Sequence, residues 1–427
     1  MIHEHYEECG QPHTTKVNNF AMPREILAAL GEIPQKGQSI EECVETIKTT
    51  FKYSVKTMHP LFNDKLYCGS DPIGQIAELI TAVLNTGVHV YHVSPVFSVM
   101  EVECIKFFGA RFGFNPETVD GCLNPGGSMS NMMSVLCARQ ETFPHVRTDG
   151  WAPEDKPIGF TPIQSHYSIA RGAAVCGMGL NQMRGVPCDR QTGKMSIEAL
   201  EQMVEAEIAK GNKPFYVNSM AGSTVMGSYD DHKAISAICK KYKMWHHIDG
   251  CWGGFLAFAD KHKDKGLFDG AELADSISLN AHKGWGVPQQ CSLIIINDHK
   301  NILLKTCKSN ADYLFHETEY SQYDIADKTL SCGRRPDGLK LWLSLQRHGH
   351  DGYVRMAEEA FDKAIYMTQQ IRAQPEIFTM VNEPMGCNVC FWYTPPAFRN
   401  KPFSDSQKAN VHKMLFARFH EKGTLLI

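Results

Sequence analysis

The chain has 427 residues, of which 43% are hydrophobic and 21% charged, the proportions of an ordinary globular protein. Its formal net charge is −4, so no basic excess favours a nucleic acid or an anionic membrane as a partner. No apolar run reaches the roughly 18 residues that a membrane span requires. At roughly 100–200 residues per domain, this length predicts one large domain and a smaller one.

The 15 cysteines are odd in number and scattered along the chain. A secreted disulfide framework would show an even and dense set. The first residues also lack the basic and apolar stretches of a signal peptide. We therefore expect a soluble protein of a reducing compartment, the cytoplasm.

In chain order, the first predicted segment is an N-terminal arm over residues 1–55. Within it, a Pro-Gln-Lys-Gly turn leads to Ser39, a typical N-cap residue, and apolar residues at helical spacing follow as far as Ile47. We expect a helix that begins directly after Ser39.

Residues 56–330 are predicted to form a large domain in which strands alternate with amphipathic helices. Two of its helices begin after the N-cap Ser196 and at Ala234. The predicted strands are 214–218, 244–248, 276–279 and 291–296. Such alternation indicates an α/β fold with a mostly parallel sheet covered on both faces. Ligands bind to such sheets beyond the carboxyl ends of the strands.

Residues 331–427 are predicted to form a smaller C-terminal domain. It contains a long helix over 338–370 and an apolar strand over 387–393. The sequence ends within a further predicted strand at 423–427, so we expect this domain to be incomplete.

Three loops at predicted strand ends carry reactive groups. Asp249 follows a buried strand, where a carboxylate is costly unless a cation such as a pyridinium nitrogen pairs with it. Lys283 follows another strand among small residues, where a neutral amine can form an imine with an aldehyde cofactor. The Pro-Gly-Gly-Ser turn over 125–128 precedes a helix and offers backbone N–H groups to a phosphate. Each signal alone is weak, because such residues are more often an N-cap, a solvated lysine and a plain turn. Their meeting at one sheet edge predicts a cofactor site.

Histidines and a Cys-x-x-Cys pair raise the alternative of a metal site. Zinc sites need ligands at defined spacings, and Cys387-x-x-Cys390 has no second pair to match it. In the predicted apolar strand, this odd spacing places the two cysteines on opposite faces. We expect both to be structural, expect His247 to pack or lie at the surface, and predict no metal.

Two motifs resemble those of the group II pyridoxal-phosphate-dependent amino-acid decarboxylases. They are His-Ile-Asp-Gly-Cys-Trp-Gly-Gly over 247–254 and Asn-Ala-His-Lys-Gly-Trp over 280–285. The similarity runs in matching order from about His59 onward, and the branch that it resembles is that of the glutamate, cysteine-sulfinate and aspartate decarboxylases. Further matching motifs lie at 164–168, 215–218, 221–224, 331–334 and 388–393.

The resemblance implies an aspartate-aminotransferase-like fold (fold type I) and pyridoxal 5'-phosphate as the cofactor. It implies that Lys283 carries the cofactor as a Schiff base, that Asp249 pairs with its ring nitrogen, and that His166 stacks on the ring and assists catalysis. Tyr323 matches a loop tyrosine that protonates the substrate carbon after carbon dioxide leaves. The implied phosphate contacts are Gly127, Ser128, His282 and Ser278, and the implied contacts near the ring oxygen are Thr224 or Ser223.

The resemblance also implies a small-molecule substrate, a small acidic L-amino acid such as glutamate, aspartate or cysteine sulfinate, and a homodimer with its active sites at the interface. Asn63, Asp64 and Val90 would lie on the substrate side of the pocket. Asp64 replaces a glutamine of the glutamate enzymes, and its charge disfavours an acidic substrate unless a cation offsets it. The family continues beyond Ile427 and supplies an arginine for the substrate's carboxylate.

Two alternatives stay open at this stage. The same cofactor supports decarboxylation-coupled oxidation, transamination and lyase reactions. The second alternative is a catalytically impaired homologue that acts as a binding or regulatory subunit. It is supported by the expected loss of the C-terminal arginine.

Overall fold

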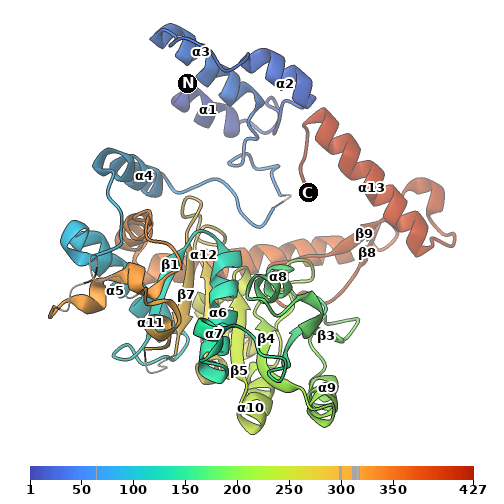
Figure 1. Ribbon diagram of the computed structural model, residues 1–427. Coiled ribbons are helices and arrows are strands. Elements are labelled where there is room, and N and C mark those ends of the chain that lie inside the picture. Colours follow the sequence, from blue (N-terminus) through green and yellow to red (C-terminus); the bar gives the residue numbers. More distant parts are fainter. Residues whose placement is uncertain (64, 298–300, 310–314, 316–317) are drawn as a thin grey trace. The chain divides into compact units, whose positions relative to one another are not determined.

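A computed structural model describes residues 1–63, 65–297, 301–309, 315 and 318–427, so Asp64 lies outside the described residues (Figure 1). The described chain divides into two compact units. The terminal unit comprises 1–70, 374–379 and 392–427, and the sheet unit comprises 71–373 and 380–391.

The sheet unit is built on a seven-stranded sheet, counted over the described residues, in the order β1-β7-β6-β5-β4-β2-β3 (Figure 1). All neighbouring strands pair in parallel except β7, which runs antiparallel to both β1 and β6. The connection from β6 to β7 is too short for a crossover, so β7 returns beside β6 in the opposite direction. The strands are β1 Asp120–Asn124, β2 Pro157–Pro162, β3 Met183–Val186, β4 Lys213–Met220, β5 Trp245–Gly250, β6 Ser276–Asn280 and β7 Ser292–Ile296.

Helices cover both faces of this sheet, which explains why its strands are apolar almost without interruption. In β7, Ile294 packs in the same core cluster as residues of helix α6, whereas its neighbour Ile295 packs in the cluster that contains residues of α5 and α12. The helices of the sheet unit are α4 Pro72–Leu84, α5 Pro95–Arg111, α6 Gly127–Thr142, α7 Val146–Asp149, α8 Ser168–Val175, α9 Ile197–Ala209, α10 His232–Tyr242, α11 Ile302–Cys307 and α12 Gly338–Arg372.

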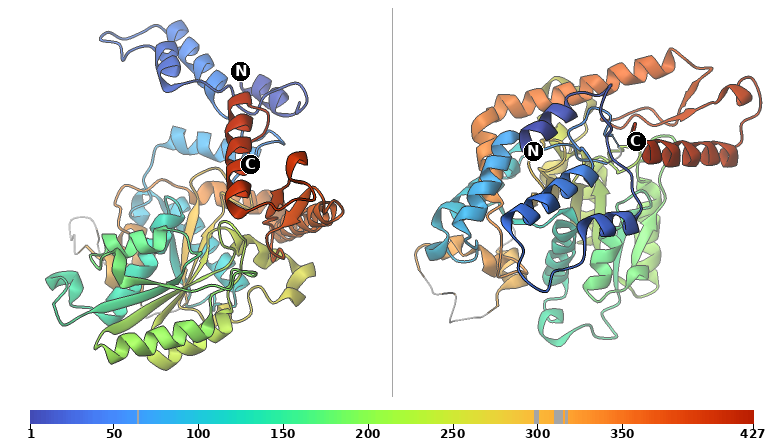
Figure 2. Two further views of the ribbon diagram at one scale, coloured as in Figure 1. Left: turned by 90° about the vertical axis from the view of Figure 1, so that its right-hand side faces the viewer. Right: turned by 90° about the horizontal axis from the view of Figure 1, so that it is seen from above.

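Helix α12 groups with the sheet unit, although the sequence placed it in a C-terminal domain. The reason is its apolar face, since Leu341, Tyr353 and Phe361 are buried in the same core as β6. The helix is interrupted at Gly349, where the backbone has a φ of 63°, a left-handed conformation that glycine adopts easily. The helix changes direction there (orange in Figure 2). The predicted domain boundaries after 55 and 330 therefore differ from the compact units.

The terminal unit contains α1 Ile2–Cys9, α2 Pro23–Leu30, α3 Ile40–Tyr53 and α13 Asp405–Lys422. Helix α3 begins after Ser39, whose side chain accepts from the Glu42 N–H in a capping box, as the sequence predicted. The predicted C-terminal strand is reduced to one bridge between Leu426 and Phe62. The strand expected at 387–393 is also shorter, because only β9 Phe391–Tyr393 forms, paired with β8 Phe378–Met380.

Candidate active site

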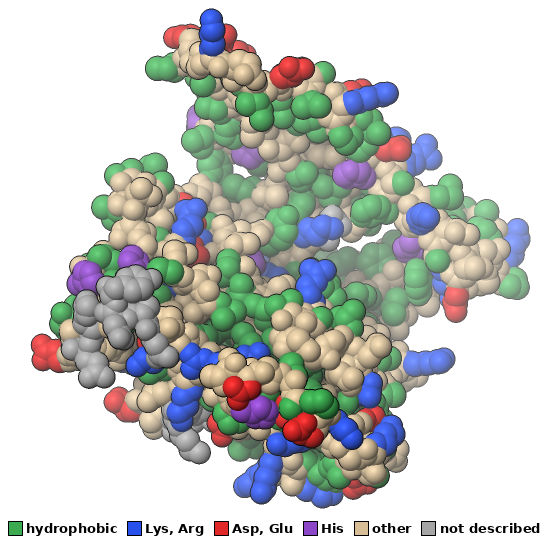
Figure 3. Space-filling model, in the orientation of Figure 1, with side chains coloured by type: hydrophobic (Ala, Val, Ile, Leu, Met, Phe, Trp, Pro, Cys, Tyr) green, Lys and Arg blue, Asp and Glu red, His purple; other side chains and the backbone are tan. Residues whose placement is uncertain are grey.

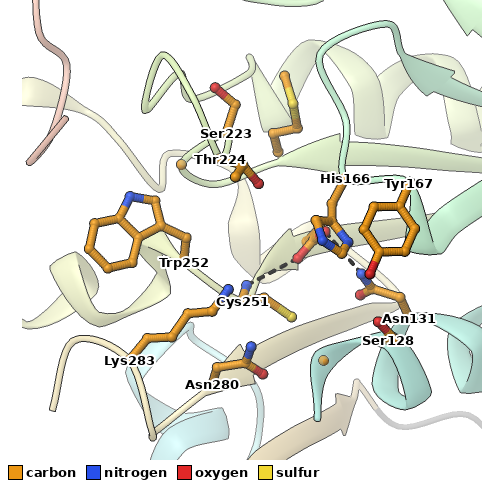
Figure 4. A pocket seen from close by; sticks show the side chains of 14 residues that line it. Ser128, Asn131, His166, Tyr167, Ser223, Thr224, Cys251, Trp252, Asn280 and Lys283 are labelled. Atoms are coloured by element: carbon orange, nitrogen blue, oxygen red, sulfur yellow. Dashed lines mark hydrogen bonds between the residues drawn. The ribbon is translucent and has the colours of Figure 1, made fainter. Parts of the chain in front are cut away.

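A cavity of about 230 Å³ opens at the carboxyl ends of the parallel strands, within the sheet unit (Figure 4). Loops after β1, β2, β4, β5 and β6 all contribute to it, as expected for a sheet of this kind. The lining residues are Gly127, Ser128, Asn131, His166, Tyr167, Met220, Gly222, Ser223, Thr224, Asp249, Cys251, Trp252, Asn280 and Lys283.

Asp249 lies near the end of β5 and is buried, with 8% of its surface exposed. Its carboxylate accepts hydrogen bonds from the Asn131 amide at 2.9 Å and from the backbone N–H of Cys251 at 3.1 Å. Burial by itself raises the pKa of Asp249, but the neighbouring His247 and the Cys251 N–H outweigh it and hold the pKa below its usual value. The carboxylate is therefore ionised at neutral pH and is available to a cation.

Lys283 lies in the loop after β6, where its backbone N–H donates to the Asn280 carbonyl at 3.1 Å. Its side chain extends into the cavity toward the end of β5 (Figure 4). The loop is packed tightly, because a side chain on the next residue, Gly284, would meet the Phe255 ring at 2.3 Å. The backbone that carries the amine is thus held in place by the core.

The N-terminus of α6 faces the same cavity. Its first turn has no side-chain cap, and Gly126 reaches the required φ of 94°, which glycine adopts easily. A Cβ on Gly127 would lie 2.4 Å from the sulfur of Cys251 and 2.9 Å from the amide of Asn280. This close approach leaves room only for backbone, and uncapped N–H groups at a helix start favour an anion such as a phosphate.

His166 lines another wall of the cavity, in the segment that follows β2. Its Nδ1 lies 2.8 Å from the hydroxyl of Ser168. Burial lowers the pKa of His166, so the imidazole is neutral at pH 7. Ser223 and Thr224 lie across the cavity from Asn280 and Lys283 (Figure 4).

Two residues expected at the phosphate, Ser278 and His282, are not among the described residues that line the cavity. Ser278 is behind Asp249, with its hydroxyl 2.7 Å from the Asn131 amide oxygen. His282 is buried next to the cavity loop and its Nδ1 lies 2.8 Å from the Cys291 carbonyl oxygen. The phosphate contacts expected for these two residues stay predictions.

Three further predicted residues, Tyr323, Val90 and Asn63, are outside the cavity lining in the described chain. Tyr323 packs against Tyr91, with ring centroids 5.7 Å apart. Val90 is buried in the sheet unit, and Asn63 belongs to the terminal unit, where its backbone N–H donates to Leu426. Asp64 lies outside the described residues. The roles expected for these four residues stay predictions.

The sequence reading missed several lining residues, above all Asn131, Cys251 and Asn280. Asn131 had a detectable signal, since it lies four residues after Gly127 and hence on the same face of α6. His247, expected to pack or lie at the surface, is fully buried and its Nε2 lies 3.1 Å from the Asn131 amide oxygen. Among the described residues, no group of three or more potential ligands is placed to hold a metal ion.

The cavity residues fit pyridoxal phosphate. Asp249 suits a protonated ring nitrogen, Lys283 suits an aldehyde carbon, and the start of α6 suits a phosphate. The Asn280 Oδ1 supports the fit, because it is buried at the cavity without a hydrogen-bond partner in the described chain. Fold and site together define the class of pyridoxal-phosphate-dependent enzymes of fold type I.

The comparisons identify the family within this class. Residues 23–394 match the pyridoxal-dependent decarboxylase conserved domain, and the chain belongs to that family. It is 37% identical over 426 residues to cysteine sulfinic acid decarboxylase of Mus musculus, covering 98% of this chain and 85% of the relative. It is 36% identical over 419 residues to glutamate decarboxylase of Drosophila melanogaster, covering 96% and 81%.

Solved structures agree with this assignment. The apo form of mouse CSAD has a TM-score of 0.92 at 34% identity, covering 100% of this chain and 91% of that chain. Oryza sativa TDC with PLP and tryptamine has a TM-score of 0.90 at 18% identity, over 99% and 88%, and shows the shared fold. The predicted family, fold class and cofactor are confirmed. The chain is a pyridoxal-phosphate-dependent carboxy-lyase that acts on an amino acid.

Every helix in the described ranges is too short or too polar to span a bilayer.

Proposed function

We propose that this enzyme decarboxylates a small acidic L-amino acid, with Lys283, Asp249 and His166 as its central residues. The observation that carries the site assignment is the convergence of the Lys283 amine, the Asp249 carboxylate and the uncapped start of α6 on one cavity. The acidic substrate class is supported by the relatives, which are named for cysteine sulfinate and glutamate.

In this proposal, Lys283 holds the cofactor covalently through its ε-amine. Asp249 pairs with the ring nitrogen, and its ionised state keeps that nitrogen protonated. Gly127 and Ser128 bind the phosphate through N–H groups at the start of α6. His166 would lie against the cofactor ring from its wall of the cavity, and Ser223 and Thr224 lie on the opposite side of the cavity from Lys283.

The chemistry divides between cofactor and protein. Bound pyridoxal phosphate supplies an electron sink for the bond between the α-carbon and the carboxylate. Asp249 maintains that sink by offering a negative charge in a buried setting. The Lys283 amine would hold the cofactor between turnovers and would be the group that the amine of a substrate replaces there. Tyr323 donates a proton to the α-carbon, an acid role that typically contributes roughly 10²- to 10⁴-fold in rate.

We also propose a homodimer whose partner subunit helps to complete each site. Lys283 is the one Lys or Arg among the described lining residues, whereas a phosphate and an acidic substrate bring several negative charges. A second copy is one source of further cations. Exposed apolar residues on α4, visible in green in Figure 3, support an interface; they are Ile76, Leu79, Ile80, Val83 and Leu84. The free cysteines support a reducing compartment such as the cytoplasm.

The test begins with cofactor attachment. Wild-type protein is incubated with pyridoxal phosphate, reduced with borohydride and digested, and mass spectrometry locates the modified residue. We expect the label on Lys283 and its loss in Lys283→Ala. Lys261→Ala, at an exposed ion pair with Asp362, is the control and should label normally. A label on another lysine would contradict the site assignment.

Carbon dioxide release is then measured with a panel of L-amino acids. Release from cysteine sulfinate, aspartate or glutamate is expected. Labelled protein that releases carbon dioxide only from aromatic or basic amino acids would contradict the acidic class while leaving the site assignment in place.

A further inference from the structure

Asn131 is the junction of a buried hydrogen-bond network behind the cavity. It lies on α6, one turn beyond Gly127, and is 1% exposed. Its Nδ2 lies 2.9 Å from Asp249 Oδ2 and 2.9 Å from Ser168 Oγ. Its Oδ1 lies 2.7 Å from Ser278 Oγ and 3.1 Å from His247 Nε2. Both amide protons and both carbonyl lone pairs therefore have partners.

The ionised Asp249 sets the direction of these bonds. A carboxylate can only accept hydrogen bonds, so Asn131 must direct its NH₂ group toward Asp249. The amide oxygen then faces Ser278 and His247, and both of these must donate to it. A flipped amide would place its oxygen against the carboxylate, in a buried setting where that repulsion is strong.

The requirement continues to His247. Burial lowers its pKa to about 4, so the ring carries one proton at pH 7, and that proton must be on Nε2. Nδ1 is then an acceptor, and the hydroxyl of Ser276 lies 2.9 Å from it. Ser276 in turn accepts from the indole N–H of Trp245 at 2.9 Å, which leaves its own proton free to donate to His247. Every hydrogen bond from Trp245 through Ser276, His247 and Asn131 to Asp249 can therefore be made with one donor and one acceptor.

The second amide proton of Asn131 reaches His166 through Ser168. Because Ser168 Oγ accepts from Asn131, its hydroxyl proton is available for His166 Nδ1 at 2.8 Å. The backbone N–H of Ser168 also points to this Nδ1, at 3.3 Å. With Nδ1 occupied as an acceptor, the neutral ring carries its proton on Nε2, the nitrogen that Ser168 does not contact.

We propose that Asn131 is a positioning residue that couples the Asp249 carboxylate to the tautomer of His166. Through one amide group it holds the carboxylate in its acceptor state and orientation, and it makes His166 present an N–H at Nε2. The inference rests on the proposed roles of Asp249 and His166, and it adds the residue through which these two cavity groups act together.

The first test reads the tautomer directly. Protein labelled with ¹⁵N-histidine, without cofactor, is studied by NMR at pH 8, and the His166 signal is assigned by its loss in His166→Gln. We expect the Nε2-protonated form. Ser168→Ala removes the hydroxyl donor and leaves His166 Nδ1 only the longer contact with the backbone N–H of residue 168, at 3.3 Å. We therefore expect the Nδ1-protonated form to gain population, with the dissociation constant for pyridoxal phosphate within about threefold of wild type.

Asn131→Asp removes the NH₂ group at nearly constant shape and places a second carboxylate against Asp249. We expect at least a tenfold weaker binding of pyridoxal phosphate together with a mixed His166 tautomer. Ser134→Ala is the matched control, because the Ser134 hydroxyl donates to the backbone carbonyl of Asn131 at 2.7 Å and not to its side chain. It should leave the tautomer unchanged.

A wild-type His166 protonated on Nδ1, or an unchanged tautomer in Ser168→Ala, would overturn the proposal, and neither result depends on whether Asn131→Asp folds. The proposed function fails separately, through the absence of a borohydride-fixed label on Lys283, whereas the tautomer is read without cofactor.

Discussion

Replacing Gly127 by alanine tests whether the start of α6 is built for close approach to an anion. The new Cβ would lie 2.4 Å from Cys251 Sγ, whereas ordinary contacts between such atoms are roughly 3.5–4.0 Å. The Cys251 sulfur cannot easily move aside, because the side chain is buried and its thiol donates a hydrogen bond to the Ser278 hydroxyl at 3.3 Å. Overpacking of this kind costs about 1–3 kcal/mol. If displacement of the α6 start relieves the strain, the dissociation constant for pyridoxal phosphate rises roughly 5- to 140-fold.

The assay is fluorescence titration of the cofactor, with thermal unfolding of the cofactor-free protein measured in parallel. Gly37→Ala is the control, since a Cβ there meets open space. Adding Cys251→Ala to Gly127→Ala removes the closest clash and should restore part of the affinity, a coupling that a double-mutant cycle measures. A lower unfolding temperature with unchanged cofactor affinity would refute the reasoning, because the turn would then serve only the fold.

Three further predictions concern other parts of the molecule. Tyr323→Phe should lower kcat by roughly 10²- to 10⁴-fold with cofactor affinity unchanged. Tyr320→Phe is the control, because Tyr320 also packs against the Tyr91 ring, and it should leave kcat unchanged. An equal loss of kcat in both variants would contradict the acid role of Tyr323. Leu79→Glu, on the exposed face of α4, should shift sedimentation toward the monomer, and the equally exposed Leu180→Glu should not. Burial lowers the pKa of His232 to about 4, so the imidazole is protonated at a higher pH in the unfolded chain than in the folded one, and the free energy of unfolding falls as the pH drops from 6.5 toward 4. In urea unfolding, the free energy of unfolding of His232→Gln should therefore decrease by about 2 kcal/mol less than that of wild type between pH 7 and 5. An identical pH dependence in the two proteins would contradict this role of His232.

Much of the fold could be predicted because its signals are local. Ser39 and Ser196 cap helices as expected, since an N-cap hydroxyl needs only the backbone three residues onward. Apolar runs also located β4, β5 and β6 to within a few residues. The orientation of β7 and the grouping of α12 with the sheet were not predictable in this way, because both depend on how distant surfaces pack.

In the candidate site, too, some features could be predicted from local sequence and others depend on how distant segments pack. By itself, the sequence indicated the family and the cofactor through its motifs, and it predicted Lys283, Asp249 and His166 as site residues. The structure places these three side chains at one cavity. Only the tertiary structure placed the Ser278 hydroxyl against the Asn131 amide and His282 against the Cys291 carbonyl. It also brought Asn131 against Asp249, a residue 118 positions away. Hydrogen-bond partners so far apart leave no periodic trace in the sequence, because their distance and direction exist only once the sheet and α6 have packed.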